Sequence, residues 1–95
     1  MKKKQKKTNQ RRITFLINAS EAKKVSLVGE FNNWNPEKHS MKSEDKGQWI
    51  KTVMLNPGTY EYKFLVDGNW LLDTKNDHSR LNCYGTLNSL ITVSP

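Results

Sequence analysis

The sequence has very little cysteine and no long hydrophobic run. Its single cysteine, Cys83, leaves no partner for an internal disulfide, which favours a reducing compartment. No apolar stretch approaches the roughly 20 residues that a membrane-spanning helix needs. The N-terminal cations are not followed by the apolar segment of a signal peptide. These absences predict a cytoplasmic protein without a membrane span.

The chain also lacks the patterns of enzymes and metal sites. His39 and His78 stand apart from other metal-ligating residues. No nucleophile-elbow motif and no phosphate-binding glycine loop is present. Glycoside hydrolysis needs two carboxylates roughly 5–10 Å apart across a cleft, and the candidates Glu30, Asp73 and Asp77 lie in loop-like stretches. We therefore expect no catalysis, no metal and no cofactor.

Positive charge is concentrated at the N-terminus. The formal net charge is +7, but seven of the 16 basic residues lie within residues 1–12, and the remaining nine balance the nine acidic residues. Residues 1–11 are therefore predicted to be a basic, disordered tail, and residues 12–95 a neutral folded domain. Nucleic acid is an unlikely partner for such a domain. Only the tail could attract RNA, anionic lipid or an acidic protein, and then weakly.

After the tail, short β-branched and aromatic runs alternate with turn signals. No segment has a convincing period of 3.6 residues, whereas a chain of this length can form one modest core. Several short strands separated by turns predict an all-β protein, an antiparallel β-sandwich. The predicted strands cover residues 13–17, 25–28, 49–55, 60–66, 70–73 and 87–93.

The pair Asp67-Gly68 predicts a two-residue hairpin, which fixes the pairing of its strands. Leu65 is then predicted to pair with Trp70, and Lys63 with Leu72. Directly opposed residues point to the same face of a sheet. The face made of Tyr60, Tyr62, Phe64 and Val66 is the better core face. Lys63 and Trp70 are therefore predicted to lie together on the outer face.

Two other tryptophans have different sequence surroundings. Trp34 lies in an Asn- and Pro-rich loop, where it could either cap the edge of the sandwich or offer an exposed ring. The face of such a ring can pack against the C–H face of a sugar. Trp49 begins an alternating apolar strand and is predicted to lie in or near the core.

Three strings follow one another along the chain: GEFNNW at residues 29–34, YEYKFLVDGNW at residues 60–70 and GTLNSLI at residues 85–91. Together they resemble the family-48 carbohydrate-binding modules, which include the glycogen-binding domain of the AMP-activated protein kinase β subunit and the isoamylase-type early-set domains. The string GEFNNW at residues 29–34 is similar to the family's G-x-F-N-x-W. Residues 60–70, YEYKFLVDGNW, resemble Y-x-Y-K-F-x-V-D-G-x-W, and residues 85–91, GTLNSLI, resemble G-x-x-N-x-x-I. The matches span about residues 12–94.

The resemblance implies an immunoglobulin-like early-set β-sandwich with an α-1,4-glucan such as glycogen, starch or a malto-oligosaccharide as its ligand. Tyr84 departs from the aliphatic residue that kinase-type modules tend to carry, and could add stacking surface. The ligand-binding residues implied by the resemblance, with this one added, are Trp34, Lys63, Trp70, Tyr84, Thr86 and Asn88.

The printed sequence ends at Pro95, directly after the third motif, so we expect a stand-alone module. Its expected function is non-catalytic recognition of α-glucans by tryptophan stacking. An alternative stays open, because a fold can be kept when its ligand is lost. In that alternative the domain is a protein-interaction adaptor that docks a glucan-metabolising enzyme without binding sugar itself.

Overall fold

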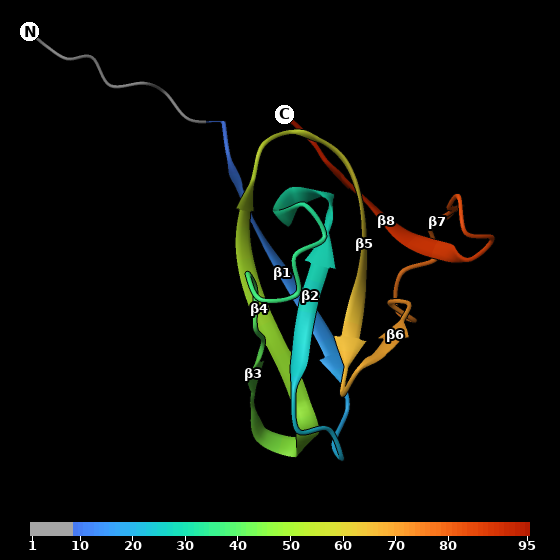
Figure 1. The fold of residues 1–95 in the computed structure, drawn as a ribbon. Coiled ribbons are helices and arrows are strands. Elements are labelled where there is room, and N and C mark those ends of the chain that lie inside the picture. The colour runs from blue at the N-terminus through green and yellow to red at the C-terminus, as the bar shows by residue number, and fades with distance from the viewer. Residues whose placement is uncertain (1–8) are drawn as a thin grey trace, which may run out of the picture.

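The computed structural model describes residues 9–95, and in them the chain is built almost entirely of strands (Figure 1). The predicted basic tail lies mostly outside these residues, and Arg11 is already the first residue of a strand. The strands of this part of the chain are β1 (Arg11–Asn18), β2 (Val25–Gly29), β3 (Lys42–Ser43), β4 (Gln48–Leu55), β5 (Gly58–Val66), β6 (Asn69–Leu71), β7 (Ser79–Leu81) and β8 (Leu87–Val93). Two 3-10 helices, η1 (Glu30–Asn32) and η2 (Asp45–Gly47), connect them.

All strand pairs are antiparallel and form two layers, as predicted for an early-set immunoglobulin-like sandwich. One sheet has the order β1-β4-β3, and the other has the order β2-β5-β8-β7, with β6 also paired to β5. Figure 1 shows that β6, β7 and the segment between them project to one side of the two layers. No helix within residues 9–95 is long and apolar enough to cross a membrane.

The core lies between the two sheets and is rich in aromatic rings. Phe15 of β1 meets Tyr62 of β5 edge-on, with 5.0 Å between ring centroids. Tyr62 and Phe64 are almost completely buried, so the predicted core face of β5 is confirmed. Trp49 packs against this core, also as predicted, and its indole N–H donates to the carbonyl of Ala19.

The β5–β6 hairpin has the predicted register, with Phe64 opposite Leu71 and Leu65 opposite Trp70. Both turn residues have positive φ, 47° at Asp67 and 85° at Gly68, as a primed turn requires. The predicted pairing of Lys63 with Leu72 is not part of the ladder, because β6 ends at Leu71.

Lys63 occupies a junction in this sheet. The edge of β5 that pairs with β8 does so from Gly58 to Tyr62, and the same edge pairs with β6 from Phe64 onward. β6 and β8 therefore diverge at Lys63, and the outer face of the sheet opens there. Sequence reasoning missed β3 and β7, which are two and three residues long and too short to show a strand period.

Candidate ligand-binding groove

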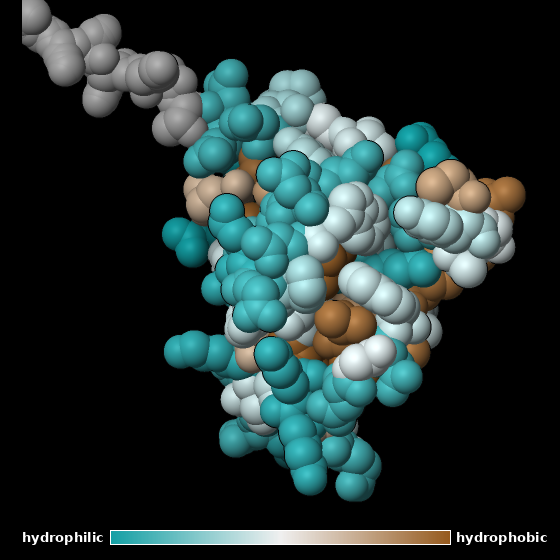
Figure 2. All heavy atoms as spheres, in the orientation of Figure 1, coloured by the Kyte–Doolittle hydropathy of each residue, from teal (hydrophilic) through white to brown (hydrophobic). Residues whose placement is uncertain are grey.

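A groove of about 1110 Å³ opens on the outer face where β6 and β8 diverge. We call it the tryptophan groove, after the two tryptophan residues in its lining. Figure 2 shows hydrophobic and weakly polar side chains gathered toward the centre and right of this view, next to a hydrophilic left side. The groove contains all six residues predicted as ligand contacts. Its lining is Trp34, Glu61, Lys63, Trp70, Leu72, Leu81, Asn82, Cys83, Tyr84, Thr86, Leu87 and Asn88.

A tight turn after η1 holds Trp34. Its backbone N–H donates to the carbonyl of Gly29 at 2.9 Å, and its φ of 58° lies in the left-handed region. That conformation is unfavourable for a bulky residue. Gly29 is required beside β5, since a Cβ there would lie 2.7 Å from the Cβ of Tyr62. The residue stays 36% exposed, so the turn holds a tryptophan at the surface against its backbone preference.

The buried amide of Asn32 stabilises this turn. Its Oδ1 accepts the N–H of Gly29 at 3.0 Å, and its Nδ2 donates to the carbonyl of Leu27 at 2.9 Å. The same Nδ2 lies 2.8 Å from Nδ1 of His39. Since the amide nitrogen is a donor, His39 Nδ1 must accept, which requires the neutral ring. Burial, with Lys51 and Lys38 nearby, lowers the pKa of His39 and favours that form.

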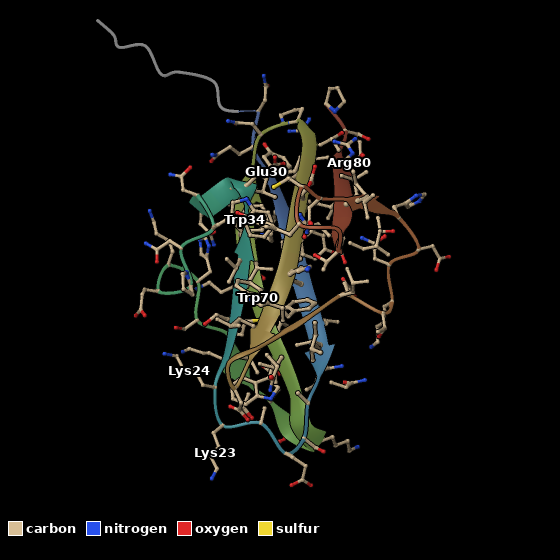
Figure 3. The ribbon with its side chains drawn as sticks, turned by 45° about the vertical axis from the view of Figure 1, so that its right-hand side comes forward. Lys23, Lys24, Glu30, Trp34, Trp70 and Arg80 are labelled. Atoms are coloured by element: carbon tan, nitrogen blue, oxygen red, sulfur yellow. The ribbon has the colours of Figure 1, made fainter. Side chains whose placement is uncertain are left out.

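Trp70 and Lys63 reach the groove from the β5–β6 hairpin. Trp70 is 50% exposed, the largest exposure of the tryptophans. Figure 3 shows Trp34 and Trp70 on the same side of the molecule, with Trp34 toward Glu30 and Trp70 toward Lys24. The ammonium of Lys63 donates to the hydroxyl oxygen of Thr86 at 3.3 Å. The predicted outer-face neighbours, Lys63 and Trp70, thus line one groove.

The opposite wall is the turn that joins β7 to β8. Tyr84 stands at its tip with 86% of its surface exposed. Gly85 has a φ of 82°, a conformation that suits glycine. The side-chain oxygen of Asn82 accepts the backbone N–H groups of Tyr84 and Thr86 at 2.9 and 3.1 Å. This turn presents one exposed ring and one hydroxyl to the groove.

Asn88 forms part of the groove floor and is only 6% exposed. Its Oδ1 accepts from Asn82 at 3.0 Å, and its Nδ2 donates to Glu61 Oε1 at 2.9 Å. Glu61 Oε2 also pairs with Arg80 at 3.3 Å. The amide predicted to contact a ligand directly is therefore held by protein partners, and one Nδ2 hydrogen and one Oδ1 lone pair are left for a ligand.

Sequence reasoning missed half of the lining. Leu81, Leu87 and Cys83 come from β7, the start of β8 and the turn between them, and β7 itself was not predicted. Asn82 carried a usable signal, because an Asn before Tyr84-Gly85 is typical of an Asx turn. Glu61 and Leu72 also had a signal, because period-two alternation places Glu61 on the face of Lys63 and the hairpin pairing predicts Leu72 opposite Lys63.

A second groove, of about 720 Å³, runs between the edges of β1 and β8, and we call it the β1–β8 groove. Its lining is Thr14, Phe15, Leu16, Tyr62, Asp73, Lys75, Asn76, Asp77, His78, Leu90, Ile91 and Thr92. The Tyr62 hydroxyl donates to Asp73 Oδ2 at 2.7 Å, and Asn76 Nδ2 donates to that hydroxyl at 3.0 Å. Burial and the Asp73 hydrogen bond raise the pKa of Tyr62 well above its usual value. These polar groups stabilise one another across the groove.

Comparisons with known proteins agree with this architecture. The solved maltogenic amylase from S. marinus superposes with a TM-score of 0.77 at 24% identity, over 90% of this chain and 14% of that one. At that identity the likeness shows the fold alone.

Among curated proteins, the rice (Oryza sativa subsp. japonica) protein FLOURY ENDOSPERM 6, chloroplastic, is 34% identical over 85 residues, covering 87% of this chain and 15% of that protein. Human 5'-AMP-activated protein kinase subunit beta-2 is 34% identical over 88 residues, covering 93% of this chain and 31% of the subunit. A 1,4-alpha-glucan branching enzyme of Rhodopseudomonas palustris (strain BisB5) is 39% identical over 56 residues, covering 59% and 8%. The chain thus spans less than a third of the length of these relatives.

The family model described as the glycogen recognition site of AMP-activated protein kinase matches residues 13–95. This range contains both sheets almost completely, together with every residue that lines the tryptophan groove. The chain therefore belongs to this family of glycogen-recognition domains.

Proposed function

We propose that the domain binds α-1,4-glucan chains, such as glycogen, starch and malto-oligosaccharides, in the tryptophan groove without catalysing a reaction. One observation carries the proposal: two exposed tryptophan rings, Trp34 and Trp70, line the same groove as the Lys63–Thr86 pair of hydrogen-bonding groups. Aromatic faces pack against the C–H faces of sugars, and polar groups at the ring edges bind hydroxyls. Membership in a glycogen-recognition family supports this assignment.

Each side chain has a distinct part in the proposed complex. Trp34 and Trp70 supply apolar platforms, and Tyr84 adds a third ring from the opposite wall. Lys63 and Thr86 donate hydrogen bonds to sugar hydroxyls, while Asn88 contributes through its remaining amide hydrogen. Since the groove is open, we expect affinities on the order of micromolar to millimolar for short glucans.

Titration of intrinsic tryptophan fluorescence with β-cyclodextrin, a ring of α-1,4-linked glucose, tests the proposal. We expect a saturable change that Trp70→Ala abolishes without loss of the folded state. Trp49→Phe is the matched control, because Trp49 packs against the core and should leave binding intact. Absence of binding by the folded native protein up to millimolar cyclodextrin would refute the proposal. Insensitivity to salt would separate it from polyelectrolyte binding by the basic tail.

One observation favours a second candidate, the protein-interaction adaptor. Within residues 9–95, β1 pairs only with β4, so the other edge of this eight-residue strand has no strand partner. Open edges accept additional strands from other polypeptides. In this candidate a glucan-metabolising enzyme docks on β1. Its binding should survive Trp34→Ala and Trp70→Ala and be lost in Leu16→Lys, the reverse of the pattern for glucan binding.

A further inference from the structure

Asn82 is the most highly hydrogen-bonded side chain of the tryptophan groove, and no sequence motif assigned it a role. Its Oδ1 accepts two backbone N–H groups, those of Tyr84 and Thr86. Backbone N–H groups can only donate, so they fix which end of the amide is oxygen. The nitrogen Nδ2 must therefore face the other way, toward Thr86 Oγ1 and Asn88.

The Asn82 amide nitrogen settles the direction of the Thr86 hydroxyl. Nδ2 donates to Thr86 Oγ1 at 2.7 Å, and Lys63 Nζ donates to the same oxygen at 3.3 Å. A threonine hydroxyl has two acceptor lone pairs and one hydrogen. Both lone pairs are used, so the hydrogen is left to donate. Within residues 9–95 no protein acceptor receives that hydrogen, and Thr86 is exposed in the groove lining.

The second hydrogen of Asn82 Nδ2 begins a chain of hydrogen bonds across the groove floor, in which every donor and acceptor is fixed. It bonds Asn88 Oδ1 at 3.0 Å, which directs Asn88 Nδ2 toward Glu61 Oε1 at 2.9 Å. The Glu61 carboxylate only accepts, and its Oε2 takes a further bond from Arg80 at 3.3 Å. Neither amide can turn over without placing two donors or two acceptors against each other.

We propose that Asn82 is a positioning residue that makes Thr86 an obligatory hydrogen-bond donor to the ligand. This inference rests on the proposed glucan-binding function. It adds which partner donates the hydrogen bond between Thr86 and the ligand. The groove then prefers, at this point, a ligand atom that accepts, namely a sugar hydroxyl or ring oxygen. Asn82 acts through Thr86 and through the turn, and need not touch the sugar.

Replacing Asn82 by aspartate reverses the hydrogen bond to Thr86 while keeping the turn. It also places a carboxylate oxygen against Asn88 Oδ1, but this effect is common to both proteins compared in the aspartate background. One carboxylate oxygen still accepts from the N–H groups of Tyr84 and Thr86. The other oxygen replaces the amide nitrogen, so the Thr86 hydroxyl donates to position 82 and no longer to the ligand. Thr86→Val removes the hydroxyl altogether. The two substitutions should therefore overlap in their effect on binding, as expected for residues in direct contact.

The test is a double-mutant cycle measured by calorimetric titration with β-cyclodextrin. Thr86→Val in the native background should weaken binding about five- to tenfold, the usual effect of one hydrogen bond. In the Asn82→Asp background, Thr86→Val should weaken it less than about twofold further. Thr86→Ser keeps the hydroxyl and should bind β-cyclodextrin nearly as tightly as the native protein. Thr14→Val, a matched substitution on β1, should leave the affinity unchanged. Equal losses in both backgrounds would overturn the proposal.

A second measurement needs no ligand. Carbon-13 NMR gives the pKa of the carboxyl introduced by Asn82→Asp, with and without Thr86→Val. A donated hydroxyl stabilises the carboxylate, so removing it should raise that pKa. An unchanged pKa would show that the hydroxyl does not turn toward position 82, and would overturn the proposal even if the native protein failed to bind cyclodextrin.

Asn82→Ser repeats the cycle if the aspartate variant does not fold. A serine oxygen can still accept within the turn but lacks the two amide donors. Thr86→Val should again have less effect in this background than in the native one. Full additivity would contradict the proposed role of the Asn82 amide nitrogen. Loss of binding in Trp70→Ala, measured alongside, shows separately whether the groove is the glucan site.

Discussion

The tryptophan groove and the β1–β8 groove are both large concavities of one small domain, yet their side chains are used in different ways. In the β1–β8 groove, Tyr62 is buried and its hydroxyl is paired with Asp73 and Asn76. In the tryptophan groove, Trp34, Trp70 and Tyr84 are exposed, and the exposed Thr86 hydroxyl, which accepts two hydrogen bonds, has no acceptor of its own among residues 9–95. The side chains of the β1–β8 groove hydrogen-bond to one another and stabilise the fold. Those of the tryptophan groove leave aromatic surface and a hydroxyl group exposed to solvent.

This difference supports the proposal that the tryptophan groove binds glucans through groups that the fold leaves unsatisfied. Exposed aromatic rings are costly for a monomeric domain to display, because apolar surface prefers burial. Trp34 adds a second cost, since its backbone has positive φ. Features that oppose stability gather in the tryptophan groove, and those that favour stability gather in the β1–β8 groove. We therefore expect substitutions in the tryptophan groove to lower glucan affinity, and substitutions in the β1–β8 groove to lower the free energy of unfolding.

The largest expected effect is on binding, in Trp34→Gly. Loss of the ring should lower glucan affinity by about 2–3 kcal/mol, in the range of tryptophan hot spots. Glycine accepts positive φ without strain, so this variant should be more stable than Trp34→Ala by about 0.5–1 kcal/mol. Cyclodextrin titration and thermal unfolding measure the two quantities. If Trp34→Gly were the less stable variant, the φ at position 34 would not be a source of strain.

Tyr62→Phe should have the opposite outcome in the β1–β8 groove. Loss of the hydroxyl leaves Asp73 Oδ2 without its donor and removes one of the two acceptors of Asn76 Nδ2, so we expect stability to fall by about 2 kcal/mol. The affinity of the folded protein for cyclodextrin should not change. Tyr60→Phe is the control, because the Tyr60 hydroxyl bonds only the exposed carbonyl of Asn56. A marked loss of affinity in Tyr62→Phe would show that the two grooves are coupled.

Lys63→Met sharpens the comparison within the tryptophan groove. Methionine keeps an unbranched apolar stem on β5 and removes the ammonium donor. We expect affinity to fall by about 1.5 kcal/mol, as for a charge-assisted hydrogen bond, with little change in stability. Lys51→Met, on β4 of the other sheet, is the matched control for loss of one positive charge. Comparable affinity losses in both variants would point to net charge and not to the Lys63 contact.

The smallest expected effect is the pH dependence contributed by His39. Its pKa is lowered from 6.5 by burial and by Lys51 and Lys38, so the unfolded chain takes up the proton more readily. Stability should therefore be complete above pH 6.5 and decrease below it until the folded protein is also protonated, and solvent screening of this partly exposed ring keeps the decrease small. Urea unfolding between pH 8 and pH 5 measures this decrease.

His39→Gln is the variant that tests the pH effect, since a glutamine oxygen can still accept from Asn32 but does not titrate. It should remove most of the decrease. His78→Gln, at an exposed position in the β1–β8 groove, should retain it. If both variants kept the same pH profile as the native chain, other groups would be responsible for the acid sensitivity.

The parts of the site that follow from local chemistry could be predicted from the sequence. Asp67-Gly68 admits one turn geometry, and period-two alternation then places Lys63 and Trp70 on one face. The opposite wall could not be predicted in this way. Leu81 reaches the groove because β7 pairs with β8, and a strand of three residues is too short to show a period in the sequence.

Asn88 shows the same limit for a single residue. The family resemblance implies a ligand contact, and its place in the groove lining is consistent with that prediction. The sequence gives no sign that Asn82 and Glu61 hold its amide from both sides, because these partners lie six and 27 residues away along the chain. How much of a polar side chain is left for a ligand depends on such distant partners.

The sequence alone determined the six longer strand segments, the hairpin register and the aromatic core face, because each depends on neighbours within a few residues. Tertiary structure alone decided where β6 and β8 diverge, which side chains line the groove formed there, and which hydrogen-bonding groups remain free. Those outcomes depend largely on contacts between segments far apart in the chain. The hydroxyl of Thr86 acquires its direction only when Lys63, from a distant strand, joins Asn82 of its own turn.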